Sequence, residues 1–268
     1  MSGTSAPRAV LTNDDGIDSE GLRALAEASV AAGLDVLVAA PDGEASGTSA
    51  ALTPAMLIPA TSNGRIATRR TTLPGLPGVP AYAVRALPAY IAFTAVRGAF
   101  GPPPRLLLSG INLGPNTGRS VLHSGTVGAA MTAAIAGVRA AAFSLDVRDE
   151  AGERHWATAA MVARQVLPIL PELAPGVVLN VNVPNVPPGK LRGIRTARLA
   201  TRGTVQVSVG AATDEFVEVT VSESGEAPEP ESDSGLLTEG FASVTPVRPV
   251  SDGALSVLPW PPAARLGR

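Results

Sequence analysis

Four side chains that carry oxygen stand in polar loops, and each loop follows a short apolar run of the sequence. They are Asp14, Asp15, Ser46 and Asn112. In an open parallel sheet the loops beyond the carboxyl ends of the strands lie side by side, so side chains from three such loops can converge. Two adjacent carboxylates with a hydroxyl and an amide oxygen suit Mg²⁺ or Mn²⁺, which prefer oxygen ligands. The pattern therefore predicts a site for one divalent cation.

Each of these residues also has an ordinary structural interpretation. Asp14 and Asp15 before Gly16 could form a turn in which a carboxylate caps the following helix. Ser46 could be a turn hydroxyl, and Asn112 could bond the backbone beside a glycine. Only their combination at three successive strand ends favours the cation site, and the residues alone leave both interpretations open.

A second polar group precedes an alanine-rich stretch. Ser124, Gly125 and Thr126 stand where a helix would begin, and free helix amides at that end attract phosphate. The alternative is an ordinary helix cap, which Ser and Thr often provide. His123 could act as an acid near neutral pH, although a lone histidine is more often a packing or surface residue.

The composition excludes several other kinds of site and partner. The chain of 268 residues has no cysteine and two histidines, which excludes thiol catalysis, iron–sulfur clusters and cysteine-based zinc sites. A formal charge of −2 without a basic run argues against a nucleic acid polymer as partner. The most apolar helical stretch, residues 127–143, is short and interrupted by polar residues, so we expect no membrane partner and a cytoplasmic protein.

The hydrophobic pattern predicts an α/β fold built from strand–helix–strand units around a mainly parallel sheet. We expect strands at residues 9–11, 35–40, 105–109, 138–145 and 177–183, and helices at residues 22–30, 126–136 and 151–167. Beyond residue 184 the pattern changes, and residues 204–209 and 215–221 are typical of a β-hairpin. The acidic stretch that follows, residues 222–234, is most simply a solvated loop. We therefore expect a single domain with a core at about residues 8–185 and a C-terminal extension at about residues 186–268.

The loops together resemble a known family. Residues 10–17, 38–47, 108–116 and 124–127 are similar, in order and spacing, to the motifs of the SurE family of metal-dependent 5'/3'-nucleotidases. The resemblance runs from about residue 8 to residue 184, and residues 240–246 look like the closing strand of the family. It implies a Rossmann-like three-layer core, a C-terminal extension used in a homodimer or homotetramer, and hydrolysis of phosphomonoesters, typically nucleoside monophosphates.

The resemblance also implies roles for individual residues. The family's divalent-metal ligands correspond to Asp14, Asp15, Ser46 and Asn112, of which Asp14 and Asp15 would be catalytic. Its phosphate-binding residues correspond to Asn116, Ser124, Gly125 and Thr126. Ala45, Tyr90 and Thr132 depart from the residues usual in relatives. None of the three is a proposed ligand, but together they extend the expected substrates from nucleotides to a related small phosphorylated metabolite.

Two other functions use the same residues. A noncatalytic sensor could bind a phosphorylated ligand with these loops, and tight binding without hydrolysis would identify it. A metal-dependent glycosyl transferase also uses carboxylates at strand ends, but the usual Asp-x-Asp spacing is missing. The motifs of dinucleotide oxidoreductases, P-loop NTPases, serine hydrolases of the α/β-hydrolase type and zinc proteases are absent as well.

Overall fold

A computed structural model describes residues 6–52, 65–147, 152–201, 205–212, 216–223 and 227–251. Its main sheet has nine strands: β1 (Arg8–Thr12), β2 (Asp35–Pro41), β3 (Thr68–Leu73), β4 (Leu76–Val84), β5 (Leu106–Leu113), β6 (Arg139–Asp146), β7 (Val178–Pro184), β8 (Ile194–Thr196) and β11 (Ala242–Val247). The helices are α1 (Glu20–Ala31), α2 (Pro88–Ala95), α3 (Gly125–Ile135), α4 (Trp156–Val166) and α5 (Asp233–Thr238). Three short 3₁₀ helices are η2 (Gly118–His123), η3 (Leu167–Glu172) and η4 (Pro188–Lys190).

The sheet places the three polar loops at one edge. Its strand order is β3-β4-β2-β1-β5-β6-β7-β11-β8, and the six strands from β4 to β7 are parallel. β3 and β11 run antiparallel to β4 and β7, and β8 runs parallel to β11. Leu11 pairs with Val38 on β2 and with Leu108 on β5, so the loops after β2, β1 and β5 leave the sheet next to one another. This confirms the predicted mainly parallel sheet.

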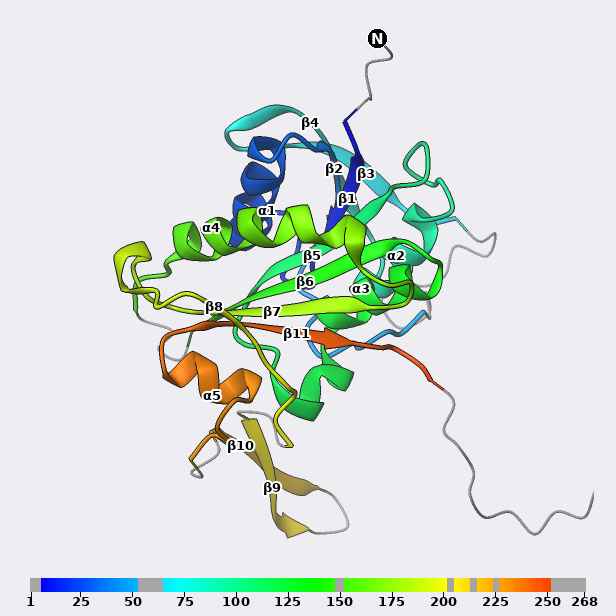
Figure 1. The fold of residues 1–268 in the computed structure, drawn as a ribbon. Helices are drawn as coiled ribbons and strands as arrows, with labels where there is room; N and C mark the ends of the chain where they lie inside the picture. Colours follow the sequence, from blue (N-terminus) through cyan, green and yellow to red (C-terminus); the bar gives the residue numbers. More distant parts are fainter. Residues whose placement is uncertain are drawn as a thin grey trace, which may run out of the picture.

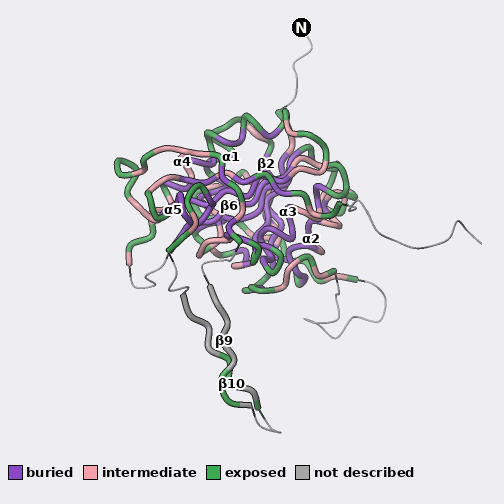
Figure 2. The backbone as a smooth tube through the Cα atoms, turned by 60° about the horizontal axis from the view of Figure 1, so that its bottom comes forward, coloured by how far each residue is buried: buried purple, intermediate pink, exposed green. Residues whose placement is uncertain are grey.

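Helices cover both faces of the sheet and make the three layers visible in Figure 1. α1 and α4 pack on one face, where Phe143 is the largest fully buried side chain. A Cβ on Gly21 would lie 1.9 Å from the Ile111 carbonyl oxygen, so glycine lets α1 lie directly on β5. On the other face the alanine-rich side of α3 packs closely on β5 and β6, next to α2. Figure 2 shows the resulting buried interior.

Two predicted elements differ from the observed ones. The strand expected at residues 105–109 continues to Leu113, because after an irregularity at Gly110 its pairing with β6 resumes at Asn112. The helix expected at residues 151–167 begins only at Trp156. Residues 152–155 are not helical, and the backbone N–H of His155 donates to the Asn185 side chain at 2.8 Å. In both cases contacts with a distant segment decide the boundary.

The chain beyond Pro184 divides into two parts. β8 and β11 join the main sheet, and α5 packs against β11 and β7. β9 (Val205–Ala212) and β10 (Val217–Glu223) form a separate antiparallel hairpin that projects from the body (Figures 1 and 2). The predicted hairpin is thus confirmed. None of the helices in the described ranges has the length and apolar character needed to cross a membrane.

Candidate metal and phosphate site

Asp14 is the most deeply buried side chain of the predicted cation site. It follows β1 and is 4% exposed. Its Oδ2 accepts a hydrogen bond from the backbone N–H of Thr126 at 3.0 Å, and its Oδ1 accepts one from the Thr126 hydroxyl. Burial raises the pKa of Asp14, and these hydrogen bonds oppose the rise. The carboxylate therefore sits at the positive end of α3, more than 100 residues away in sequence.

Asp15 stands beside Asp14 with fewer donors. Its Oδ2 accepts one hydrogen bond, from the backbone N–H of Leu113 at 3.2 Å. Burial, followed by the charges of Asp14 and then Glu44, raises the pKa of Asp15 to about 7. The N–H of Leu113 offsets only part of that rise. The site thus concentrates negative charge that the protein itself does not neutralise.

Asn112 joins the same group of side chains. Its Oδ1 accepts from the Thr126 hydroxyl at 3.2 Å, and its Nδ2 donates to the Gly114 carbonyl at 2.8 Å. The second contact orients the amide so that its oxygen faces the Thr126 hydroxyl. The structure therefore brings Asp14, Asn112 and Thr126 into one hydrogen-bonded cluster.

Ser46 lies in the neighbouring loop after β2. That loop is fixed to the site by the backbone N–H of Ala45, which donates to the Asp14 carbonyl at 2.7 Å. Ser46 itself is exposed, and its hydroxyl donates to Glu44 Oε1 at 3.0 Å. The loop is in place, but the Ser46 hydroxyl bonds a carboxylate outside the predicted ligand set.

The start of α3 packs tightly against Asp14. Ser124 is the N-cap, and its Oγ accepts from the Val127 N–H at 3.1 Å. A Cβ on Gly125 would lie 2.8 Å from Asp14 Oδ2 and 3.1 Å from Thr48 Oγ1, so only glycine fits without displacing a neighbour. The helix cap that the sequence offered as the alternative interpretation is therefore present. The N–H and the hydroxyl of Thr126 both donate to Asp14, which ties the start of α3 to the loop after β1.

Asn116 is held mainly by its backbone. Its N–H donates to Asn182 Oδ1 at 2.7 Å, and its carbonyl accepts from the side-chain amides of Asn180 and Asn182. The Asn116 side-chain amide contacts Ser144 Oγ at 2.8 Å. The amide Nδ2 is the donor in this contact, so the Asn116 side chain is held as well as its backbone.

The residues present fit a hard divalent cation. Within the described ranges no three His, Asp or Glu side chains come close enough together to hold a metal. A cation at Asp14 and Asp15 would therefore need hydroxyl, amide or water oxygens to complete its shell, and Mg²⁺ and Mn²⁺ accept such ligands. The partly unneutralised charge of Asp15 is the structural feature that favours such an ion.

Several residues of the site region have contacts or burial that were not predicted. Thr126 was expected on the phosphate, whereas its hydroxyl links Asp14 to Asn112. Asn180 and Asn182 were not singled out, although two asparagines at alternate positions of an apolar strand are a readable signal of polar contacts on one buried face. Asp233 lies in a segment that was interpreted as a solvated loop, and it is fully buried.

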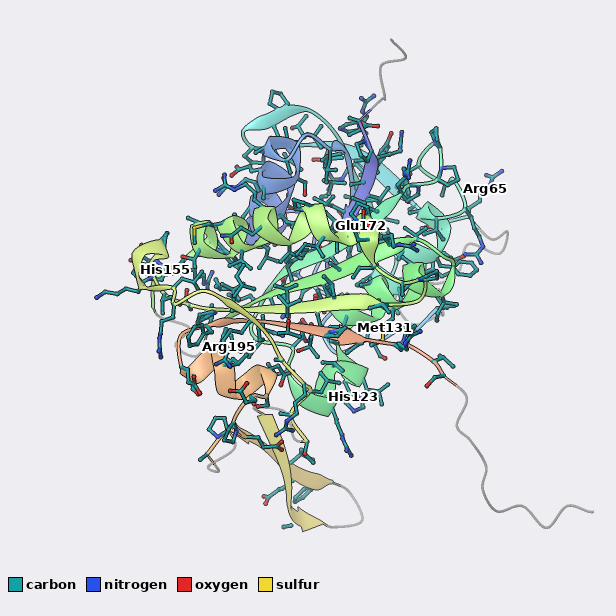
Figure 3. The ribbon with its side chains drawn as sticks, viewed as in Figure 1. Arg65, His123, Met131, His155, Glu172 and Arg195 are labelled. Atoms are coloured by element: carbon teal, nitrogen blue, oxygen red, sulfur yellow. The ribbon has the colours of Figure 1, made fainter. Side chains whose placement is uncertain are left out.

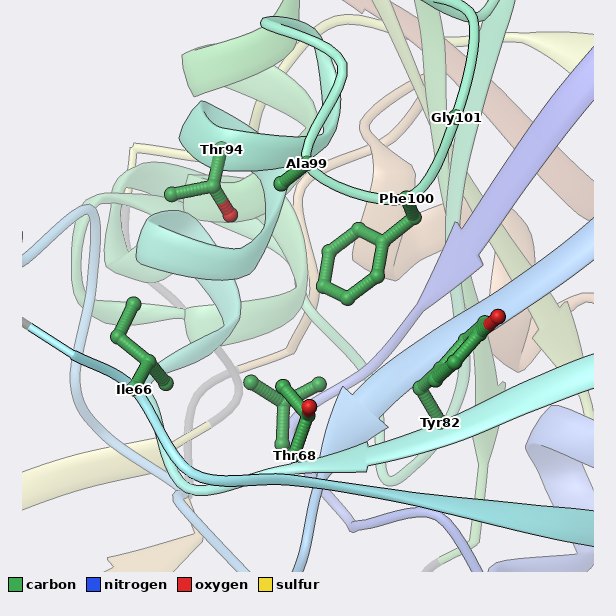
Figure 4. Close-up of a pocket in the computed structure, with 8 residues that line it drawn as sticks. Ile66, Thr68, Tyr82, Thr94, Ala99, Phe100 and Gly101 are labelled. Carbon is green, nitrogen blue, oxygen red and sulfur yellow. The ribbon is translucent and has the colours of Figure 1, made fainter.

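Other candidate features lie apart from this cluster. His123 ends η2 and is exposed, and His155 precedes α4 on the other side of the molecule (Figure 3). A hollow of about 530 Å³ opens between the β3–β4 hairpin and the segment after α2 (Figure 4). It is lined by Ile66, Thr68, Tyr82, Val84, Thr94, Ala99, Phe100 and Gly101. None of these is a predicted site residue.

Comparisons with known proteins show the family and the fold of this chain. The family model described as "Survival protein SurE" matches residues 9–206. A 5'/3'-nucleotidase SurE of Yersinia enterocolitica is 38% identical over 199 residues, which is 73% of this chain and 71% of that protein. A 5'/3'-nucleotidase SurE of Yersinia pestis is 34% identical over 248 residues, 90% of this chain and 89% of that protein. The crystal structure of the SurE protein from Aquifex aeolicus superposes with a TM-score of 0.75 at 30% identity, covering 91% of this chain and 94% of that one.

Proposed function

This chain belongs to the SurE family, and from that membership and the site geometry we infer that it is a phosphomonoesterase of the 5'-nucleotidase type. Its substrates are nucleoside monophosphates or a related small phosphorylated metabolite. The observation that carries the inference is the Asp14–Asp15 pair, which follows a central strand and abuts the N-terminus of α3. Hydrolysis of a phosphomonoester needs compensation of charge on the phosphoryl oxygens and a fixed position for the group.

One divalent cation, Mg²⁺ or Mn²⁺, completes the proposed site. Asp14, Asp15 and Asn112 would hold it, with Ser46 after its hydroxyl turns away from Glu44. When bound, the cation supplies positive charge beside the phosphoryl oxygens. Because Asp14 is fixed by Thr126, it holds its position with little reorganisation.

We place the phosphate against Asn116 and residues 124–126. The macrodipole of α3 favours an anion at this end, and Gly125 lets the chain approach closely because it has no side chain. Asn116 is rigidly held by its backbone, so its side chain can orient the substrate. The Ser124 oxygen accepts from Val127, which leaves its own hydroxyl hydrogen for a ligand.

The order in which we rank the substrates follows from the positions where this chain differs from the family motifs. Thr132 donates to the Gly128 carbonyl inside α3, and Ala45 is 7% exposed and fixes the loop through its backbone. Neither side chain offers a new charged group to a substrate, so we rank nucleoside monophosphates first. We expect the enzyme to act in the cytoplasm.

The decisive experiment measures phosphate release from AMP, other nucleoside monophosphates and a generic aryl phosphate, with Mg²⁺, with Mn²⁺ and after removal of metal with EDTA. We expect hydrolysis that EDTA abolishes and added metal restores. Release that is absent from every substrate with both metals would overturn the proposal. Tight nucleotide binding without release would instead establish the sensor function, which no observation in the structure favours.

We also propose that the β9–β10 hairpin contacts a second copy of the chain. A two-stranded hairpin is marginally stable alone, and this one exposes Phe216 and Val219 by 54% and 56%. A closed two-fold dimer, or a tetramer made of two such dimers, would bury these side chains. Light scattering on the full chain, and on a variant with residues 200–225 replaced by a short Gly-Ser linker, tests this. A full-length monomer at micromolar concentration would contradict it.

A further inference from the structure

The segment that carries Asn116 is fixed by side chains from the C-terminal third of the chain. Asn182 on β7 bonds both the N–H and the carbonyl of Asn116, at 2.7 and 2.9 Å. Asn180 adds a second bond to the same carbonyl at 2.7 Å. Because both ends of the Asn182 amide are engaged with opposite partners, this amide has one orientation. These contacts fix the peptide groups on both sides of Asn116.

Asp233 fixes the same segment two residues later. Its Oδ2 accepts from the Gly118 N–H at 2.8 Å, while its Oδ1 accepts from the N–H groups of Ala200 and Ser234 at 3.0 and 2.9 Å. Asp233 is fully buried, and burial raises its pKa. Its three donors come from three segments: the loop after β5, the chain before the β9–β10 hairpin, and α5 itself. One buried carboxylate thus joins the base of the hairpin to the loop that carries Asn116.

Gly118 lies close to the proposed phosphate position along the chain. η2 (Gly118–His123) is the only element between Gly118 and Ser124, the N-cap of α3. A shift of Gly118 would therefore be transmitted through one short 3₁₀ helix to residues 124–126. It would also move Asn116, two residues before it. Displacements of about 1 Å in a positioning group can lower rates about a hundredfold.

We propose that Asp233 is a positioning residue, which together with Asn182 holds residues 116–118 and the start of α3 in the geometry that binds the phosphate. This inference rests on the proposed function, because it assigns a role within the same site. It makes the C-terminal part of the chain a component of the substrate site, although Asp233 contacts neither substrate nor cation.

The test is the variant Asp233→Asn, which keeps the volume but replaces one acceptor oxygen by an amide that faces N–H donors. We expect the inhibition constant of inorganic phosphate and the KM for AMP to rise about tenfold. The Kd of Mn²⁺ for the metal-free protein should stay within about twofold, because Asp14 and Asp15 are not contacted. Hydrogen exchange of the amides at residues 116–124 should become faster, and this readout does not depend on activity.

Two control variants separate positioning from general destabilisation. Glu229→Gln changes a carboxylate at the same base of the hairpin, where it bonds Arg198 and the Thr201 N–H but not the loop. Val162→Ala removes buried contacts on α4, on the opposite face of the sheet, and should lower the Tm. In both controls we expect the inhibition constant of phosphate and the exchange rates of the amides at residues 116–124 to stay at their wild-type values.

Each outcome decides between the alternatives. If Asp233→Asn binds phosphate as the wild type does and residues 116–124 stay protected, the positioning role is wrong. If Val162→Ala has the same Tm as Asp233→Asn and weakens phosphate binding to the same extent, the effect is general destabilisation and the inference also fails. If Asp233→Asn does not fold, Asn182→Ser answers the same question by the same readouts. A wild type that hydrolyses no phosphomonoester would overturn the proposed function, while the exchange data would still decide whether Asp233 holds the loop.

Discussion

Two groups of buried carboxylates in this molecule differ in the donors that compensate their negative charge. Asp233 is fully buried and accepts three backbone N–H bonds from three segments. Asp14 and Asp15 are adjacent in sequence, and Asp15 accepts a single N–H bond while the charges of Asp14 and Glu44 act on it. Burial raises the pKa values of all three aspartates. The two groups are alike in desolvation and unlike in the donors around them.

This difference distinguishes a structural carboxylate from one that is suited to bind a cation. Charge-assisted bonds from backbone N–H groups compensate a buried carboxylate without any ion, as at Asp233. Asp15 accepts from one such donor and lies beside a second carboxylate, and a cation compensates this arrangement best. Burial alone therefore does not identify the functional acid. The balance between negative charge and donors does.

The largest effect should follow from removing charge at the pair. Asp14→Asn or Asp15→Asn keeps the side-chain volume but removes one of the two charges that hold the cation, so phosphate release should fall by about a thousandfold or more. The assay uses AMP with limiting Mn²⁺, and circular dichroism checks the fold. Asp18→Asn, in the same loop but exposed, is the matched control and should leave activity unchanged. Activity within about threefold of wild type in either variant would mean that the pair is not the site.

A smaller loss should come from crowding Asp14 without changing its charge. Gly125→Ala would place a Cβ 2.8 Å from Asp14 Oδ2, so the carboxylate or the start of α3 must shift. We expect kcat/KM to fall about a hundredfold with a modest change in Tm. Gly189→Ala meets no atom within 4 Å and should have no effect. If Gly125→Ala retains full activity, the tight fit between α3 and Asp14 is not needed for catalysis.

The neutral members of the proposed ligand set should matter less than the charged ones. Asn112→Ala removes an oxygen that also accepts from Thr126, and we expect the Kd of Mn²⁺ to rise about tenfold. Ser46→Ala should raise it less, because the Ser46 hydroxyl bonds Glu44. Calorimetric titration of the metal-free proteins measures both. Unchanged metal affinity in the two variants would remove these residues from the ligand set and leave the carboxylate pair with other partners.

The smallest effect should come from Glu229, an exposed carboxylate at the base of the β9–β10 hairpin, where Asp233 also lies. Hydrogen bonds from Arg198, then Thr201, lower the pKa of Glu229 to about 2, from an ordinary value of 4.5. The ionised form is thus favoured in the folded state, so its stabilisation is present above pH 4.5 and is lost as the pH falls towards 2. Wild type should exceed Glu229→Gln slightly in Tm at pH 6, and the difference should vanish near pH 2. Because the group is exposed, added salt should also reduce the difference. A Tm difference that stays constant with pH would show that charge is not its origin.

The sequence alone was sufficient for features that depend on near neighbours in the chain. Hydrophobic periodicity and polar turns located the central strands and the helix that Ser124 caps, because these signals lie within one element and its ends. The fold class followed from the alternation of strands and helices. Asp14 and Asp15 stood out only together with Ser46 and Asn112, because all three loops follow strands of one predicted sheet and their side chains can converge.

Only the tertiary structure decided which groups meet. Thr126 bonds Asp14 across 112 residues of sequence, and Asp233 reaches Gly118 across 115. No local pattern encodes such pairs, because they depend on strand order and on how each connection crosses the sheet. For the same reason Asp233, within an acidic stretch typical of a solvated loop, proved to be buried. Periodicity determines which face of an element is apolar, whereas packing between distant elements determines which polar groups are enclosed with a partner.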